Sequence, residues 1–432
     1  TLKDRPFMML LAGSNALTGI LPGWELYPTT RLEPLVRADA ERMLKLFLSG
    51  IEDVPKDLLK RLLEQGKGNP YALKTLVRYL RQSGAIRLNR KRWQIDENVT
   101  WDLDMPETLE GVVLAQFGSM SPEERQVMAH AAVIGHEFWL GALVALHRQG
   151  APDVSEPGSV SKDGASTAIQ VSLDRLIERR FIEPAESSLP GQEAFVFRSD
   201  MHWSVTSEVL PEATKTKLHR VVLQWLKLHV GETDGDHLKE LARHASAADF
   251  PVQAAGYLMR LAVVLRSQYH WRQEREVLER AFSLVGPDDN ALKLEVSLAL
   301  GDSCVELGDM DAALESFQHA LNIAWRMRHH RSGARALQRI GVLERERGSH
   351  RVGYDHLLQA LRLFESVNDT LGAAETCIEL GRLMWFEAKF EQALNAYRRA
   401  EKLYRAMRNR PGLGLAVHCI GGVHFDRGDL DL

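Results

Sequence analysis

The sequence predicts a mainly α-helical protein that ends in a superhelical stack of helix pairs. Two series of small residues carry this prediction, and both recur with a step of 40 residues. The first series consists of Gly301, Gly341, Gly381 and Gly421. The second series consists of Gly308, Gly348, Ala388 and Gly428. Because glycine fills only about 7% of positions in an average protein, this register is not expected by chance.

The residues between these markers follow the same step. A pattern of small, large and small residues recurs as Ala313, Phe317 and Ala320, then Gly353, Leu357 and Ala360, then Ala393, Tyr397 and Ala400. Residues spaced by three and four share one face of a helix. We expect the small residues to let two antiparallel helices approach, and the large residue to fill the space between units. The pattern resembles tetratricopeptide repeats with a 40-residue period, in place of the commoner period of about 34.

Composition and charge limit the class of protein. The chain has 432 residues, of which 45% are apolar and 26% charged, with a net charge of −4. These values indicate a globular protein of a few domains. The nearly balanced charge gives no electrostatic reason to expect nucleic acid or an anionic membrane as a partner. No apolar run approaches the roughly 20 residues that a membrane-spanning helix needs.

Cysteine usage and the two ends of the chain give further expectations. Cys304, Cys377 and Cys419 lie on the predicted first helices of the repeats, where a cysteine most simply acts as a small buried apolar residue. A reducing, cytoplasmic setting fits this usage, and no cysteine–histidine set has the spacing of a zinc site. The chain starts just before an apolar strand and ends within a repeat, so we expect a fragment of a larger protein.

The first hundred residues combine one strand with several helices. Residues 1–30 contain the apolar strand Phe7 to Ala12, followed by a loop rich in glycine and proline. Residues 31–100 carry apolar stripes with helical spacing, interrupted at Gly68 and Pro70.

Residues 101–215 predict a mixed domain. Ser121 with Glu124 predicts a capping box at the start of a helix, and a further helix is expected to begin at Gly135. The insertion at 151–168 is rich in Ser, Gly, Pro and Asp, and is predicted to be mobile. A hairpin is expected where Phe195 to Phe197 follows the strand that ends at Ile182. Residues 216–290 predict a helical linker with a degenerate repeat, and 291–432 the clear repeats.

Short motifs in this order resemble the bacterial signal-transduction ATPases of the STAND group. The motifs are Leu32-x-Pro34-Leu35, Gly68-Asn69-Pro70-Tyr71, Met105-Pro106-x-Thr108-Leu109, Ala131 to Gly135, Phe197-Arg198, and Leu241-Ala242-x-His244. The resemblance implies the end of an α/β NTPase core, a helical lid, a winged-helix domain and then the repeat solenoid. It also implies an output domain elsewhere, such as a kinase, a cyclase or a DNA-binding domain, and leaves a nucleotide-dependent oligomer possible.

The resemblance implies a nucleotide site for ATP or ADP. Gly68, Asn69 and Pro70 match the lid motif whose proline packs near adenine in the family, although a helix cap explains the same residues. Ser14 and Asn15 match the polar tip of the core strand. A phosphate-binding glycine-rich loop and the residues that hold Mg²⁺ are not present, so we expect them upstream of Thr1. No catalytic residue is predicted within this chain.

One departure from the family pattern concerns the winged helix. Ser199, Ser204 and Ser207 occupy the positions where many relatives have His, Glu and Tyr. This departure argues against nucleotide sensing through the winged helix and indicates a divergent or weakened ATPase.

The repeats are expected to bind a protein or peptide on their concave side, which the first helices of a solenoid line. The register predicts that this side shows Glu295, Leu298, Asp302, Arg335, Gln338, Arg345, Ile378, Arg382, Trp385 and Phe386. Trp385 and Phe386 beside Arg382 would form an aromatic and cationic surface suited to anchor a partner. The alternative is that Trp385 packs into the next unit as core.

Two functions remain open from the sequence. The first is the regulatory part of a STAND-type ATPase, in which partner binding by the repeats shifts a nucleotide-gated switch. The second is a non-catalytic scaffold that carries an ATPase remnant and works through its repeats.

Overall fold

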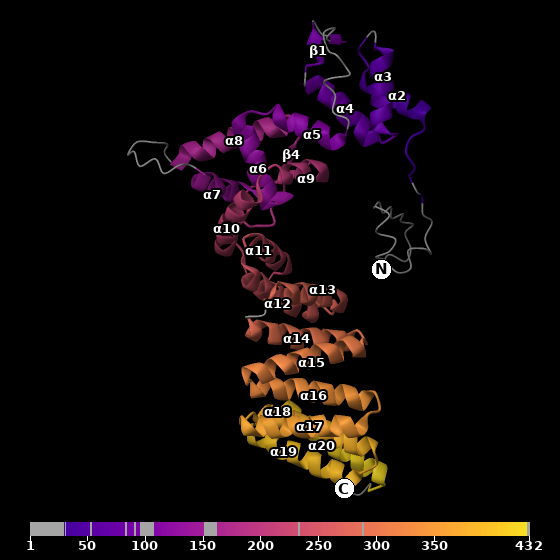
Figure 1. Ribbon diagram of the computed structural model, residues 1–432, viewed down its shortest axis with the longest axis vertical. Helices are drawn as coiled ribbons and strands as arrows, with labels where there is room; N and C mark the ends of the chain where they lie inside the picture. The colour runs from indigo at the N-terminus through magenta and orange to yellow at the C-terminus, as the bar shows by residue number, and fades with distance from the viewer. Residues whose placement is uncertain are drawn as a thin grey trace, which may run out of the picture. The chain divides into compact units, whose positions relative to one another are not determined.

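The computed structural model describes residue 30 and the ranges 32–51, 54–82, 84–89, 92–95, 108–150, 162–231, 234–286 and 289–429. Within these residues the chain forms nineteen helices and five short strands, as shown in Figure 1. The chain divides into two compact units, Thr1–Arg125 and Gln126–Leu432. The predicted strand Phe7 to Ala12 lies outside the described residues.

The first unit is a small helical bundle with a hairpin. Its elements are α2 (Arg37–Phe47), α3 (Lys56–Gly66), α4 (Pro70–Gln82), β1 (Ile86–Asn89), β2 (Arg92–Ile95) and α5 (Leu109–Gly118). Its core is aliphatic: Leu44, Leu62, Leu76 and Val112 are among its fully buried members. The apolar stripes of α2, α3 and α4 meet in this core, which is why the helical spacing predicted from residue 31 onward gives a packed unit.

The helix α6 (Pro122–Ile134) begins with the predicted capping box. The Ser121 backbone N–H donates to Glu124 Oε2 at 3.1 Å, and the Glu124 backbone N–H donates to Ser121 Oγ at 3.2 Å. These two bonds satisfy donors that the first turn of a helix leaves without partners. The prediction is confirmed.

A three-stranded antiparallel sheet follows, in the order β3 (Glu137–Trp139), β5 (Ala194–Phe197), β4 (Ile182–Ala185). The hairpin of β4 and β5 confirms the predicted pairing. The helix expected from Gly135 is wrong at its start, because residues 137–139 form β3 and the helix α7 (Leu140–Gly150) begins only afterwards. Burial of Phe138 against Phe195 and Phe197 in the sheet outweighs the helical preference of this short segment.

Two helices accompany the sheet. The helix α8 (Lys162–Glu178) begins inside the insertion predicted at 151–168, so the last residues of that insertion are helical, and residues 151–161 lie outside the described ranges. After the sheet, α9 (Asp200–Glu208) starts at Ser199, whose hydroxyl accepts from the Met201 backbone N–H at 3.2 Å.

From α10 onward the second unit is wholly helical. Four helices lead into the repeats: α10 (Glu212–His229), α11 (Gly235–Ala247), α12 (Pro251–Ser267) and α13 (Trp271–Leu284). Leu278 and Ala281 on α13 are fully buried, at the positions that the degenerate repeat predicts.

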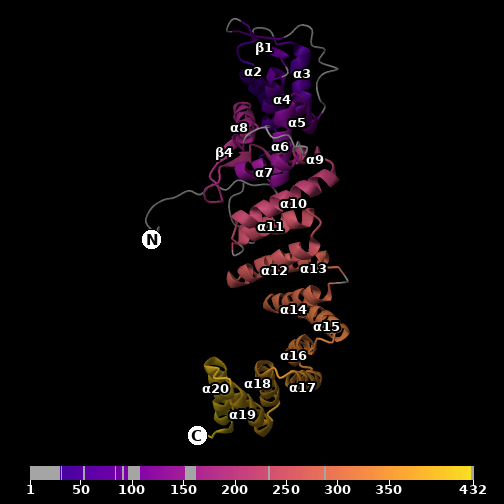
Figure 2. The same cartoon turned by 90° about the vertical axis from the view of Figure 1, so that its left-hand side faces the viewer.

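The repeats themselves are helix pairs with the predicted period. They are α14 (Asn290–Glu306) with α15 (Met310–Met327), α16 (His330–Glu346) with α17 (His350–Ser366), α18 (Thr370–Phe386) with α19 (Phe390–Ala406), and finally α20 (Arg410–Arg427). Figures 1 and 2 show consecutive pairs stacked on one another. First helices start at 290, 330, 370 and 410, so the 40-residue period is confirmed.

In α14, α16 and α18 the repeated glycine makes room for the large residue of the second helix of its own pair. A Cβ placed on Gly301 would lie 2.4 Å from the Phe317 ring, and one on Gly381 would lie 2.4 Å from the Tyr397 ring. Both rings are fully buried. The large residue therefore fills the space inside a pair, which corrects the expectation that it fills the space between units. This close approach explains why glycine recurs at this position in the complete pairs.

No described helix is long and apolar enough to cross a membrane. No group of three or more His, Cys, Asp or Glu side chains in the described ranges is placed to hold a metal ion.

Candidate functional site

The first helices α14, α16, α18 and α20 present a surface that we call the A-helix face. Its members are the predicted residues together with the neighbours that pair with them. Not all of the predicted residues are accessible: Ile378 is 2% exposed and Gln338 is 8% exposed, whereas Arg335 is exposed. The A-helix face therefore divides into residues that hold the helices together and residues that remain free for a partner.

Ion pairs between neighbouring first helices occupy most of the charges on this face. Arg339 Nε on α16 lies 3.0 Å from Asp302 Oδ1 on α14. On the other side of α16, an Arg345 guanidinium nitrogen lies 3.6 Å from Glu379 Oε2 on α18. Glu379 also pairs with Arg382 at 2.7 Å. A basic helix thus lies between two acidic ones, and these charges neutralise one another without a ligand.

Gln338 belongs to the contact between α16 and α18. Its Nε2 donates to Thr376 Oγ1 at 3.0 Å, and the Thr376 hydroxyl donates to the Gly372 carbonyl at 2.7 Å. A buried amide that has this hydrogen bond holds two helices in register. The structure places Gln338 inside the stack, away from the surface that a partner would reach.

Aromatic residues dominate the C-terminal end of the A-helix face. Trp385 is 39% exposed and Phe386 is 73% exposed at the end of α18. The Trp385 indole Nε1–H donates to Asp426 Oδ2 on α20 at 2.7 Å. The Phe386 ring contacts the His350 ring, with 5.1 Å between centroids. Trp385 is therefore neither core nor fully free, because one edge is held by α20 while part of the ring faces solvent.

Phe425 on α20 is a member of this surface that the sequence prediction omitted. It is 70% exposed and lies 40 residues after Trp385, at the same position of the next repeat. The repeat register could have identified it. Trp385, Phe386 and Phe425 together form what we call the aromatic end of the A-helix face.

Two of the first helices carry cysteines whose thiols are not activated. Burial raises the pKa of the Cys419 thiol on α20, and the charge of Arg382 lowers it only in part. Burial likewise raises the pKa of the Cys377 thiol, to about 12. Thiols with raised pKa values remain protonated and unreactive at neutral pH.

Of the residues predicted to bind nucleotide, Gly68, Asn69 and Pro70 form the turn that leads into α4. Gly68 has φ +72° and its carbonyl accepts from the Leu35 backbone N–H at 2.8 Å. Asn69 Oδ1 accepts from the backbone N–H groups of Tyr71 at 2.9 Å and Ala72 at 3.3 Å, so it caps α4. Pro70, the first residue of α4, is exposed. Ser14 and Asn15 lie outside the described residues.

Comparison with known proteins agrees with the repeat architecture. Residues 294–324 match the family model of the tetratricopeptide repeat. No curated protein sequence matches the chain. Among solved structures, BtubC (BKLC) from P. vanneervenii is 16% identical with a TM-score of 0.42, over 48% of this chain and 85% of that one.

Two further solved structures are similar at the same low level. Aspartyl phosphate phosphatase F from Bacillus subtilis is 11% identical with a TM-score of 0.39, over 72% of this chain and 85% of that one. A STAND protein with a tetratricopeptide repeat sensor from Pyrococcus horikoshii is 12% identical with a TM-score of 0.36. That similarity covers 91% of this chain and 57% of the other, so this chain spans little more than half of that protein.

Proposed function

We propose that the chain binds a protein partner through the aromatic end of the A-helix face. The observation that carries the proposal is the exposure of Trp385, Phe386 and Phe425 on two adjacent first helices. Large aromatic residues are favoured as anchors at protein interfaces because each buries a large area with few rotatable bonds. The neighbouring charges are already paired within the stack, so the apolar rings are what remains for a partner.

We further propose that this binding regulates a nucleotide switch of the STAND type. The support is the order of parts: the helical bundle with Gly68-Asn69-Pro70, then the sheet with its β4–β5 hairpin as the wing of a winged helix, then the repeats. In such a cytoplasmic switch, a partner that binds one state of the repeats shifts the balance between states.

For ATP or ADP, the residues that fit are Pro70 and Tyr71. Both are exposed in the first turn of α4, where each presents a ring to solvent. Such a surface suits the flat face of adenine. A bound nucleotide would supply the difference between the two states of the switch, whereas the repeats would supply the response to the partner.

One observation favours the alternative, a scaffold without nucleotide. Asn69 is engaged in capping α4 and the Gly68 carbonyl in holding Leu35, so the turn is accounted for without a ligand. Equilibrium dialysis with labelled ATP separates the two functions. The switch predicts saturable binding by the intact protein that Pro70→Ala and Tyr71→Ala weaken, and the scaffold predicts none at millimolar ATP.

Parallel affinity capture tests the protein-binding function. The intact chain, a double variant with Phe386→Ala and Phe425→Ala, and the control variant Tyr269→Ala are immobilised, and the proteins retained from cells of the native host are quantified by mass spectrometry. Tyr269 is 76% exposed in the turn before α13, outside the helices that form the A-helix face. Its substitution therefore also removes an exposed aromatic ring, but at another place. A partner retained by the control and lost by the double variant supports the proposal, whereas equal retention on all three contradicts it.

A further inference from the structure

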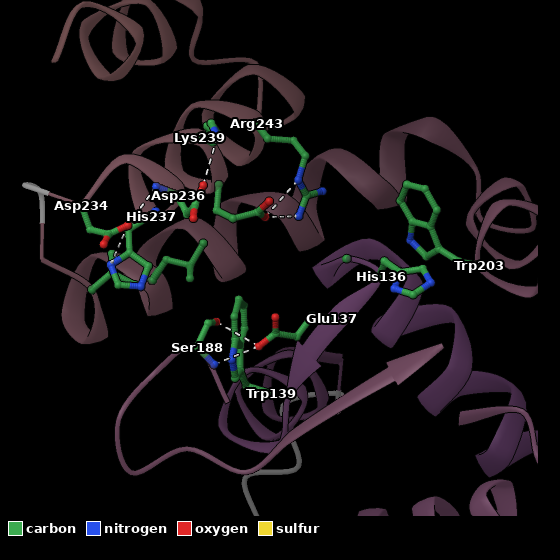
Figure 3. A pocket seen from close by; sticks show the side chains of 14 residues that line it. His136, Glu137, Trp139, Ser188, Trp203, Asp234, Asp236, His237, Lys239 and Arg243 are labelled. Atoms are coloured by element: carbon green, nitrogen blue, oxygen red, sulfur yellow. Dashed lines mark hydrogen bonds and ion pairs between the residues drawn. The ribbon is translucent and has the colours of Figure 1, made fainter. Parts of the chain in front are cut away.

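A cavity of about 550 Å³ lies between the sheet and α11 in the second unit, and Figure 3 shows it from close by. Its walls come from β3, from the loop before β5, and from the N-terminal half of α11. This volume is within the range of pockets that hold small molecules, about 300–1,000 Å³. The cavity is built from residues 135–243, so it is separate from the A-helix face.

Strand alternation directs two residues of β3 into this cavity. Phe138 packs against Phe195 and Phe197 in the core, and its neighbours Glu137 and Trp139 point to the opposite side of the strand, where both line the cavity. The Trp139 ring stacks on Trp225 with 5.8 Å between centroids. An aromatic floor with a carboxylate beside it results.

Trp139 has a buried hydrogen-bond donor that has no acceptor. The residue is 5% exposed, and its indole Nε1–H has no hydrogen-bond partner among the described residues. A buried donor that has lost its water and found no partner is unfavourable. A ligand atom that accepts this hydrogen bond would remove that cost.

The two cations that line the cavity, Lys239 and Arg243, already have acidic partners. Lys239 Nζ lies 2.9 Å from Asp236 Oδ1, and Arg243 lies 2.6 Å from Glu240 Oε2 and also donates to the Ile134 carbonyl. Both cations therefore already have acceptors on their own helix or beside it. An anionic ligand would have to displace these contacts.

Two carboxylates of the cavity form no close ion pair with a Lys or Arg in the described part of the chain, although the charge of Lys239 acts on Asp234 from a longer distance. Glu137 Oε1 accepts only from the Ser188 backbone N–H at 3.1 Å and from the Ser188 hydroxyl at 2.9 Å. Asp234 Oδ1 caps α11 by accepting from the Asp236 and His237 backbone N–H groups. Its other contact is with His237 Nδ1, at 4.0 Å.

We propose that this cavity binds a small organic cation that carries a carbonyl oxygen, of the kind found in capped arginine. The cationic group pairs with Glu137 and Asp234, and the carbonyl oxygen accepts the hydrogen bond of Trp139 Nε1–H. The aromatic floor adds cation–π attraction. Free arginine derivatives and an arginine within a peptide share this chemistry.

Isothermal titration of the intact chain with N-acetyl-L-argininamide tests the site. N-acetyl-L-citrullinamide has nearly the same shape without the charge, and is the matched ligand. We expect saturable 1:1 binding of the arginine compound with a Kd of about 1 mM or below. The citrulline compound should bind at least about tenfold more weakly. A capped Gly-Arg-Gly peptide distinguishes the sources, since tighter binding of the peptide identifies a peptide ligand and weaker binding a free small molecule.

Three conservative variants and one control complete the test. Glu137→Gln and Asp234→Asn each remove a charge while keeping an acceptor for Ser188 or for the helix cap. Trp139→Phe keeps the stack and removes the donor. Each should weaken binding about tenfold. Asp289→Asn removes the same kind of charge from the cap of α14, outside the cavity, and should leave Kd unchanged.

Several results would overturn the proposal. One is the lack of saturable binding to the folded wild-type chain up to about 20 mM. Another is equal affinity for the arginine and citrulline compounds. A third is an unchanged Kd in the Asp234→Asn variant. This variant should fold, because position 234 is exposed and the asparagine keeps an acceptor for the helix cap.

Discussion

The indole Nε1–H of Trp385 donates to Asp426 Oδ2 at 2.7 Å, which joins α18 to α20 across a 40-residue repeat. The bond fixes the orientation of a ring that is still 39% exposed. A ring held in place before binding loses less conformational freedom when a partner covers it. The aromatic end of the A-helix face is therefore preorganised by the repeat that follows it.

A double-mutant cycle measures this bond. Trp385→Phe removes the donor and keeps a ring, and Asp426→Ala removes the acceptor. Each should lower the free energy of unfolding by about 1 kcal/mol, with the double variant costing less than the sum of the two. Urea unfolding checks this. Strict additivity of the two single effects would show that the bond does not contribute.

Adding a single carbon at the repeated glycine of a first helix is expected to destabilise the protein. Gly381→Ala places a Cβ 2.4 Å from the ring of Tyr397, which is fully buried and cannot move away. We expect a loss of about 1–3 kcal/mol in the free energy of unfolding. Gly414→Ala on α20 is the control, because a Cβ there meets no atom within 4 Å, and it should be neutral or stabilising by up to about 1 kcal/mol. Similar effects of both variants on thermal unfolding would argue against the packing described.

Substitutions of Gln338 and Arg335 should differ in their effect on the free energy of unfolding. Gln338→Ala deletes the buried hydrogen bond to Thr376 and should cost about 1–3 kcal/mol of unfolding free energy. Arg335→Ala removes an exposed side chain and should change stability by less than about 0.5 kcal/mol. Thermal melts of both variants decide this. A large loss for Arg335→Ala with none for Gln338→Ala would reverse the roles assigned to them.

Buried histidines should make the second unit unstable in acid. Burial lowers the pKa of His219 to about 4 and that of its hydrogen-bonded neighbour His244 well below 6.5. The unfolded chain, with pKa values near 6.5, therefore binds more protons than the folded chain between these values. The contribution of these histidines to stability should be constant above about pH 7 and should decline as pH falls from 6.5 to 4.

A histidine variant tests the cause of that decline. His219→Gln should flatten the dependence of the melting temperature on pH between 6.5 and 4, whereas His418→Gln, at an exposed position of α20, should not. An unchanged slope in His219→Gln would assign the acid sensitivity to other groups.

The repeats were predictable because one geometric need recurs. A helix pair closed by Gly381 against Tyr397 demands a small residue at a fixed place, so the need appears in the sequence as a period. The capping box of Ser121 and Glu124 was predictable for a similar reason, since both partners lie within one turn. A structural requirement that recurs at a fixed spacing, or lies within one helical turn, is therefore visible in the sequence.

Features that depend on distant segments were not predictable. The strand β3 has three residues and pairs with β5 more than fifty residues later, so periodicity around Phe138 could not reveal it. Gln338 has the register of a surface residue, and only the approach of Thr376 from the next repeat buries it. The cavity beside Trp139 combines residues from 135 to 243 and has no sequence pattern of its own.

Site-specific photo-crosslinking tests whether a partner binds at the aromatic end of the A-helix face. A benzophenone amino acid replaces Phe386 in the intact chain, and in a second variant replaces Tyr269 as an equally exposed control. On irradiation in the native host, the variant at 386 should form one dominant covalent adduct with a partner protein, and the control should not. Absence of any adduct at 386 in the folded protein, or the same adduct at both positions, would contradict binding through the aromatic end of the A-helix face.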